Sequence, residues 1–198
     1  MFVSCVLVAS YALFIYVAFP LGAGVHPDMK AAFEQNRIVI YTHIFASLVA
    51  LIIGPVQFST KLRLKYIQFH RWSGRVYLLI GVLFGGFAGL IMAQHSFGGL
   101  VARAGFTSSA VVWIFTGAMA LYAILQKDVD AHRRWMVRNF ALTFSAVTLR
   151  IYLGLFMALG VPFSEFYPLL AWLSWVPNIL LAEWVFNRHD KALHPAIS

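Results

Sequence analysis

Long apolar stretches recur along the whole chain and are separated by short polar connections. A helix that crosses the hydrocarbon core of a bilayer needs about 20 predominantly apolar residues, and helices are the usual way to satisfy backbone hydrogen bonds in lipid. The sequence therefore predicts an all-α, polytopic membrane protein whose single membrane domain covers residues 1–198. Its second to fifth helices are expected to form a four-helix core. The six predicted helices cover about 2–22, 38–58, 71–94, 107–126, 135–158 and 166–187.

Composition agrees with this class and excludes others. Apolar residues make up 61% of the chain, charged residues make up 11%, and the mean hydropathy is +0.79, which is too apolar for a soluble domain of this length. The net charge of +8 could indicate nucleic-acid binding, but the basic residues lie in short connections, so we expect contact with the lipid bilayer and no nucleic acid. The single cysteine, Cys5, excludes an internal disulfide and a C-x-x-C-H haem attachment site.

The distribution of basic residues predicts the orientation. The first, third and fifth connections contain few Lys and Arg, so by the positive-inside rule both termini are expected in the cytoplasm. The first apolar stretch lacks the basic start and the cleavage site of a secretory signal, so we expect a retained anchor. The side of the membrane that is expected to face the cytoplasm holds 11 of the 15 basic residues, namely Lys61, Arg63, Lys65, Arg71, Arg75, Lys127, Arg133, Arg134, Arg138, Arg188 and Lys191.

Polar side chains within the apolar stretches form two groups at opposite depths. At 100° per residue, the separation of His70 from His95 returns both to within roughly 20° of one face, and two other helices carry similar pairs. A charge at the bilayer centre costs at least about 2.5 kcal/mol, so Arg150 indicates a functional site, whereas the two histidines could also lie in the wet interface. The outer group is His43, His95 and Arg150, and the inner group is Gln57, His70 and His132.

Glycines accompany the histidines on the third helix. Gly74, Gly81 and Gly85 follow His70 on or beside its face, and Gly81, Gly85 and Gly89 form two overlapping G-x-x-x-G units. Such spacing usually indicates close packing of membrane helices. The alternative is space for a porphyrin whose axial ligands are histidines from neighbouring helices.

A weak internal repeat links the third and fifth helices. FHRWSGRVY at 69–77 resembles AHRRWMVRN at 131–139, and each segment follows a basic connection. The second and third helices, and the fourth and fifth, are thus predicted to form two hairpins in parallel orientation. The copies have diverged, and the position equivalent to His43 is Gly105, so the fourth helix has no matching histidine.

These motifs carry a resemblance to known families. With GPVQF at 54–58, HRWSGRVY at 70–77 and HRRWMVRN at 132–139, residues 38–158 resemble an uncharacterised bacterial integral-membrane family known as a domain of unknown function. This resemblance implies a bacterial inner membrane. More loosely, the layout is similar to the two-haem transmembrane cytochromes b and ferric reductases, which implies haem between helices. The chain departs from that pattern because its fourth helix has no histidine.

The leading hypothesis is a membrane-embedded b-type haem protein that transfers electrons to or from a quinone or a partner protein. The alternatives are an accessory or structural subunit of a larger membrane complex and a small transporter. No catalytic residue is predicted. The expected axial ligands are the pairs His70–His132 (inner) and His43–His95 (outer), with Arg71 and Arg150 on haem propionates or a quinone oxygen.

Overall fold

The protein is a bundle of helices. A computed structural model describes residues 1–193, with side chains as far as Phe186, and every regular element in this range is helical. This confirms the predicted all-α, polytopic fold. The segments that are long and apolar enough to cross a membrane are Arg37–Gln57, Ile67–Gln94, Gly99–Leu125, Val129–Ala158 and Phe163–Phe186.

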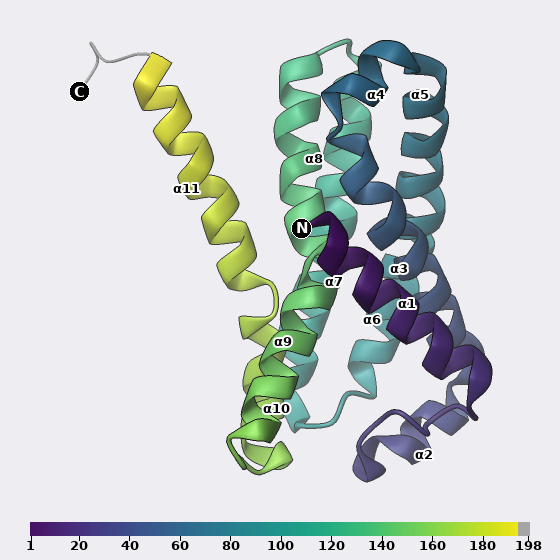
Figure 1. Ribbon diagram of the computed structural model, residues 1–198. Coiled ribbons are helices and arrows are strands. Elements are labelled where there is room, and N and C mark those ends of the chain that lie inside the picture. Colours follow the sequence, from purple (N-terminus) through teal and green to yellow (C-terminus); the bar gives the residue numbers. More distant parts are fainter. Residues whose placement is uncertain (194–198) are drawn as a thin grey trace.

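The core consists of four helical rods that alternate in direction (Figure 1). A short helix, α4 (Thr60–Lys65), connects the first two rods, and α5 and α6 are joined through a π-helical segment, η1. The core thus forms two hairpins in parallel orientation, as the repeat predicted. The rods are α3 (Arg37–Gln57), α5–η1–α6 (Ile67–Val76, Tyr77–Phe84, Gly85–Gln94), α7 (Gly99–Leu125) and α8–α9 (Val129–Thr143, Ser145–Ala158).

The remaining helices, α1, α2, α10 and α11, lie outside this core. The N-terminal α1 (Phe2–Ala18) crosses the outside of the bundle obliquely, and α2 (Pro27–Gln35) lies beyond the opposite end of the core from α4 (Figure 1). The chain then adds α10 (Phe163–Leu173), which packs beside α7, and α11 (Val176–Leu193), which diverges from the bundle. We call the end with α2 and α10 the outer end and the end with α4 the basic end.

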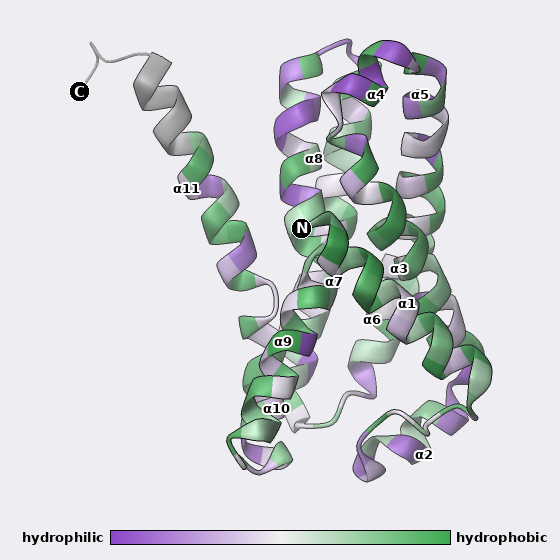
Figure 2. Cartoon of the chain, viewed as in Figure 1, coloured by the Kyte–Doolittle hydropathy of each residue, from purple (hydrophilic) through white to green (hydrophobic). Residues whose placement is uncertain are grey.

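Hydrophilic residues gather at the basic end, and apolar residues cover the middle of the bundle (Figure 2). Many large apolar side chains on the outside are exposed, including Leu79, Phe84 and Ile151. A surface of this kind is stable only against lipid tails, so the bundle contacts a bilayer. The cytoplasmic placement of the termini and the inner-membrane location stay predictions.

Several helix bounds differ from the expected ones for local reasons. The first helix ends at Ala18 rather than residue 22, since Pro20 disfavours helical backbone in the residue before it. With 17 residues and an oblique path, α1 is also shorter than the five long segments. The fourth helix begins at Gly99 rather than 107, directly after Gly98, whose positive φ of 95° turns the chain.

The fifth and sixth predicted helices are both interrupted. Between α8 and α9 the helix is broken at Phe144, beside Thr143, whose hydroxyl donates to the Asn139 carbonyl at 3.1 Å. Such back-bonding by threonine bends helices. The break between α10 and α11 precedes Pro177, which lacks the N–H that would continue the helix. Each interruption therefore follows from one residue type that the apolar pattern alone does not weigh.

A buried polar network joins three core helices at mid-depth. The Tyr77 hydroxyl donates to Asn139 Oδ1 at 2.7 Å, and Asn139 Nδ2 donates to the Trp113 carbonyl at 2.7 Å and to Thr116 Oγ1 at 2.9 Å. Thr143 accepts from Trp113 Nε1 at 2.9 Å and lies 2.7 Å from the Tyr77 hydroxyl. Tyr77 and Asn139 are equivalent positions of the repeat, so the two hairpins meet at matched residues.

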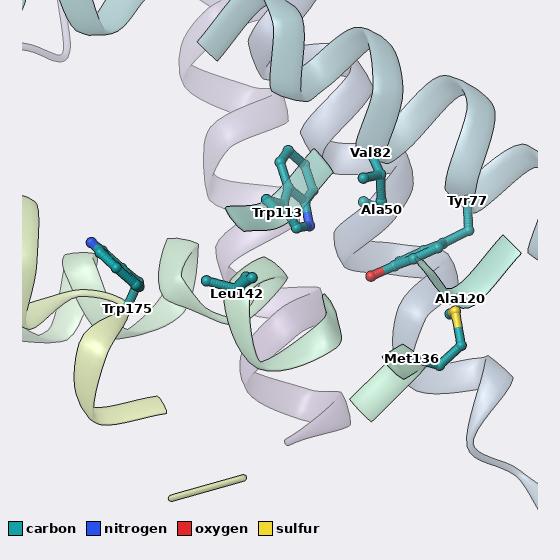
Figure 3. Packing of buried hydrophobic residues seen from close by; sticks show 8 residues of the cluster. All are labelled: Ala50, Tyr77, Val82, Trp113, Ala120, Met136, Leu142 and Trp175. Atoms are coloured by element: carbon teal, nitrogen blue, oxygen red, sulfur yellow. The ribbon is translucent and has the colours of Figure 1, made fainter. Parts of the chain in front are cut away.

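Apolar side chains surround this network. Figure 3 shows Trp113 and Leu142 between Trp175 on one side and Tyr77 on the other, with Val82 and Ala50 beside Trp113. These residues come from α3, η1, α7, α8 and the segment before α11. The core thus continues from the four rods to the C-terminal helices.

Candidate functional site

A cavity of about 310 Å³ lies in the outer half of the bundle. Most of its lining comes from α3, α6, α7 and α9, and further residues come from α1, α2, α8 and α10. Its lining is mainly apolar and includes Met92, Phe106 and Trp113. This volume is within the range of pockets that hold small organic ligands, about 300–1,000 Å³. The lining also contains the polar residues His43, Ser47, His95 and Arg150.

His43 on α3 is one of the polar residues that line the cavity, and a carbonyl group of α6 determines which ring nitrogen carries the proton. Its Nδ1 lies 2.8 Å from the carbonyl oxygen of Gly85 on α6. Because a carbonyl oxygen can only accept, Nδ1 carries the proton, and in the neutral ring Nε2 is left as an acceptor or a metal ligand. A Cβ on Gly89 would lie only 3.1 Å from Nδ1, so this glycine makes room for the imidazole.

Ser47 lies one turn after His43 on the same face of α3. Its Oγ is buried and has no hydrogen-bond partner in the described part of the chain. Ser47 also lines the cavity. A buried hydroxyl without a partner is costly, roughly 1–3 kcal/mol, so Ser47 Oγ is ready to bond a molecule in the cavity.

Arg150 on α9 is the charged group of the cavity. Its Nη1 donates to the carbonyl of Ala146 at 2.8 Å, and within residues 1–186 no carboxylate pairs with it. Four of the five N–H donors of a guanidinium remain after that bond. A cation in an apolar segment with most of its donors unused indicates a site for a group that accepts hydrogen bonds.

His95 completes the predicted outer group. It follows the last residue of α6, is exposed, and lines the cavity. The structure therefore brings His43, His95 and Arg150 together in one cavity. Nearby, the His26 ring stacks on Phe163 with centroids 4.0 Å apart, so the loop before α2 is attached to α10 beside the cavity.

The predicted inner group lies at the basic end and lines no part of this cavity. His132 Nδ1 donates to the Ala120 carbonyl at 2.8 Å, so in the neutral ring Nε2 is the acceptor, as in His43. His70 lies in the first turn of α5 and is half-buried. Gln57 is buried and donates to Ser73 Oγ at 2.8 Å, so its role in the fold is structural. Arg71 is exposed.

The glycines of the third rod pack against protein. A Cβ on Gly81 would lie 2.7 Å from Ala50 Cβ, and one on Gly86 would lie 2.5 Å from Ile114. Gly85 similarly faces Ser47 and Trp113. Neighbouring helices therefore pack closely against these glycines, which supports the packing interpretation, and Gly85, Gly86 and Gly89 also line the outer cavity.

Sequence reasoning missed Ser47 and Trp113 as contributors to the cavity. Ser47 could have been found, because it follows His43 by four residues on an apolar helix. Trp113 and Thr143 line the cavity and also belong to the buried network. Their pairing depends on the packing of α7 against α8, which no local pattern specifies.

The fold and the cavity define a class: a polytopic α-helical membrane protein with a mainly apolar cavity, into which a few polar residues face, at one end of its core. The family model described as "Predicted membrane protein (DUF2306)" matches residues 40–186, and the chain belongs to this family. Comparison with curated proteins finds no significant match, and neither does comparison with solved structures. Within the described residues, no group of three or more His, Cys, Asp or Glu side chains could hold a metal ion.

Proposed function

We propose that the protein binds a small amphipathic molecule of the quinone class in the outer cavity. One observation carries this proposal: three polar groups with free hydrogen-bonding capacity, His43 Nε2, Ser47 Oγ and the Arg150 guanidinium, belong to residues that line one apolar cavity. A ligand for this site must be mostly apolar and must carry oxygen atoms at its edge.

The chemistry of the three groups matches both redox forms of a quinone. Arg150 and Ser47 are donors, and a quinone carbonyl is an acceptor. Neutral His43 offers Nε2 as an acceptor, which suits the hydroxyl of a quinol. Trp113 and Phe106 supply aromatic surface for a flat ring. The cavity thus has partners for the head group before and after two-electron reduction.

The proposal is tested by equilibrium binding of a tail-less 1,4-benzoquinone to the purified protein in lipid nanodiscs. A hydrogen bond to a charged group contributes about 1.5–3 kcal/mol, so Arg150→Gln is expected to raise Kd about 10- to 100-fold. Ser47→Ala loses a neutral bond of about 1 kcal/mol and is expected to raise Kd about fivefold. Leu155→Ala, on the exposed face of α9, serves as the control. No binding by the wild type, or equal binding by Arg150→Gln, would refute the proposal.

The second candidate is haem b, which the sequence predicted. The observation that favours it is the fixed Nδ1 proton of His43 and of His132, because an imidazole held in this way presents Nε2 to a metal. In the outer cavity His43 and His95 would hold the iron, with Arg150 near a propionate. Bound haem would supply one-electron chemistry.

Haem is tested by the spectrum of the purified protein, reduced with dithionite minus oxidised. An α-band of a b-type cytochrome that disappears in His43→Ala would support the outer site. A spectrum without such a band would remove this candidate and leave the quinone proposal intact. The accessory-subunit and transporter alternatives stay predictions.

A further inference from the structure

A second hollow opens on the outside of the bundle, between α1 and α9. Its walls are Leu7, Val8 and Tyr11 from α1 and Leu153, Gly154 and Met157 from α9, and Arg150 contributes to it as well. Leu7 is 65% exposed and Met157 is 62% exposed, so the hollow opens toward the surface that contacts lipid. Apart from Tyr11 and Arg150, the residues that line the hollow are apolar.

Arg150 lines both this hollow and the outer cavity. The two spaces therefore meet at one side chain, with the outer cavity on the inside of α9 and the hollow on the outside. Gly154 follows Arg150 by one turn on the same face. No atom of the described residues would lie within 4 Å of a Cβ built on Gly154, so the space beside it is open, unlike the space at Gly81.

The packing of α1 explains why the hollow exists. The small residues Cys5, Ala9 and Ala12 of α1 are buried in a cluster with Leu48 and Leu51 of α3. These small residues lie on one face of α1, so this face packs closely against α3. The residues on the adjoining face, Leu7 and Tyr11, are left beside α9 without a close partner helix.

We infer that the ligand of the outer cavity carries a hydrocarbon tail, and that this tail leaves the protein through the α1–α9 hollow into the bilayer. The inference rests on the proposed function and specifies its substrate class: a lipid-soluble, tailed quinone rather than a water-soluble one. The polar head would remain with His43, Ser47 and Arg150, while the tail crosses beside Gly154. Entry from lipid suits a molecule that partitions into the membrane.

The test fills the hollow without changing the cavity. Gly154→Trp places a large side chain in the open space beside α1, and Leu155→Trp places the same side chain on an exposed position of α9 that lines neither space. Kd is measured in nanodiscs for a decyl-tailed benzoquinone and for the tail-less one. We expect Gly154→Trp to raise Kd for the tailed compound about 10-fold or more, as overfilled apolar sites do, and to leave Kd for the tail-less compound unchanged.

The outcomes separate the two proposals. If the tail-less quinone does not bind the wild type, the proposed function fails and the inference fails with it. If it binds, but Gly154→Trp affects both compounds equally or neither of them, the head-group site stands and the tail path is wrong. Gly154→Leu, which fills less of the hollow, is expected to give an intermediate effect on the tailed compound, and an equal effect of Leu155→Trp would also overturn the inference.

Discussion

Replacing Gly81 by alanine tests how the third rod is held against α3. The new Cβ would lie 2.7 Å from Ala50 Cβ and 3.1 Å from both the backbone N and Cα of Ala50. Backbone atoms cannot rotate away as a long side chain can, so the two helices must separate. Overpacking of this kind costs about 1–3 kcal/mol.

Gly154→Ala is the matched control. Both glycines lie inside helical segments, so each alanine gains about 0.5–1 kcal/mol of helix propensity. At Gly154 the Cβ meets open space, so only the gain remains. The difference between the two variants therefore isolates the packing cost of Gly81→Ala.

The assay is thermal unfolding of both variants in detergent, followed by circular dichroism. For a chain of this size 1 kcal/mol corresponds to about 2–4 °C, so Gly81→Ala should melt about 2–12 °C below Gly154→Ala. Equal melting temperatures would refute the packing argument. A bound chromophore lost from Gly81→Ala at unchanged stability would instead favour the porphyrin interpretation of the glycines.

Two further predictions concern side-chain contacts between helices. Asn139→Ala removes three hydrogen bonds, each about 0.6 kcal/mol on average in membrane proteins, so we expect a loss of about 2 kcal/mol against about 1 kcal/mol for Tyr77→Phe. Unfolding in sodium dodecyl sulfate measures both, and the reverse order would contradict the network. Arg138→Gln breaks the pair with Glu183, whose Oε2 accepts from Nη2 at 2.9 Å, and should release α11 from α8. Limited proteolysis should then cleave α11 faster, Glu183→Gln should act alike, and unchanged cleavage in both would show that the pair does not hold α11.

Much of the fold could be predicted because the bilayer imposes a simple rule. Apolar stretches of spanning length identified the rods, and the repeat identified the two parallel hairpins. The details that failed depend on single residues, such as Pro20 at the end of α1 and Thr143 at the break between α8 and α9. Apolar periodicity does not register such residues, since their effect is on backbone hydrogen bonds.

The outer group could be predicted because depth and face follow from counting along regular helices. His43, His95 and Arg150 come from three rods and share one cavity. The cavity itself could not be predicted, since it depends on how α3, α6, α7 and α9 pack together and on the position of α2. The shared face of His70 and His95 was also counted for a regular α-helix, whereas η1 lies between them and its wider turns change the count.

The central claim is that the outer cavity holds the head group of a quinone, and photoaffinity labelling tests it most directly. An azido-quinone is bound to the protein in nanodiscs, activated by light, and its attachment sites are mapped by mass spectrometry. We expect labels on α3 near His43 and Ser47 and on α9 near Arg150, all suppressed by excess unlabelled quinone. Labels spread over the exposed faces of α11 and α7, with no effect of competitor, would contradict the claim.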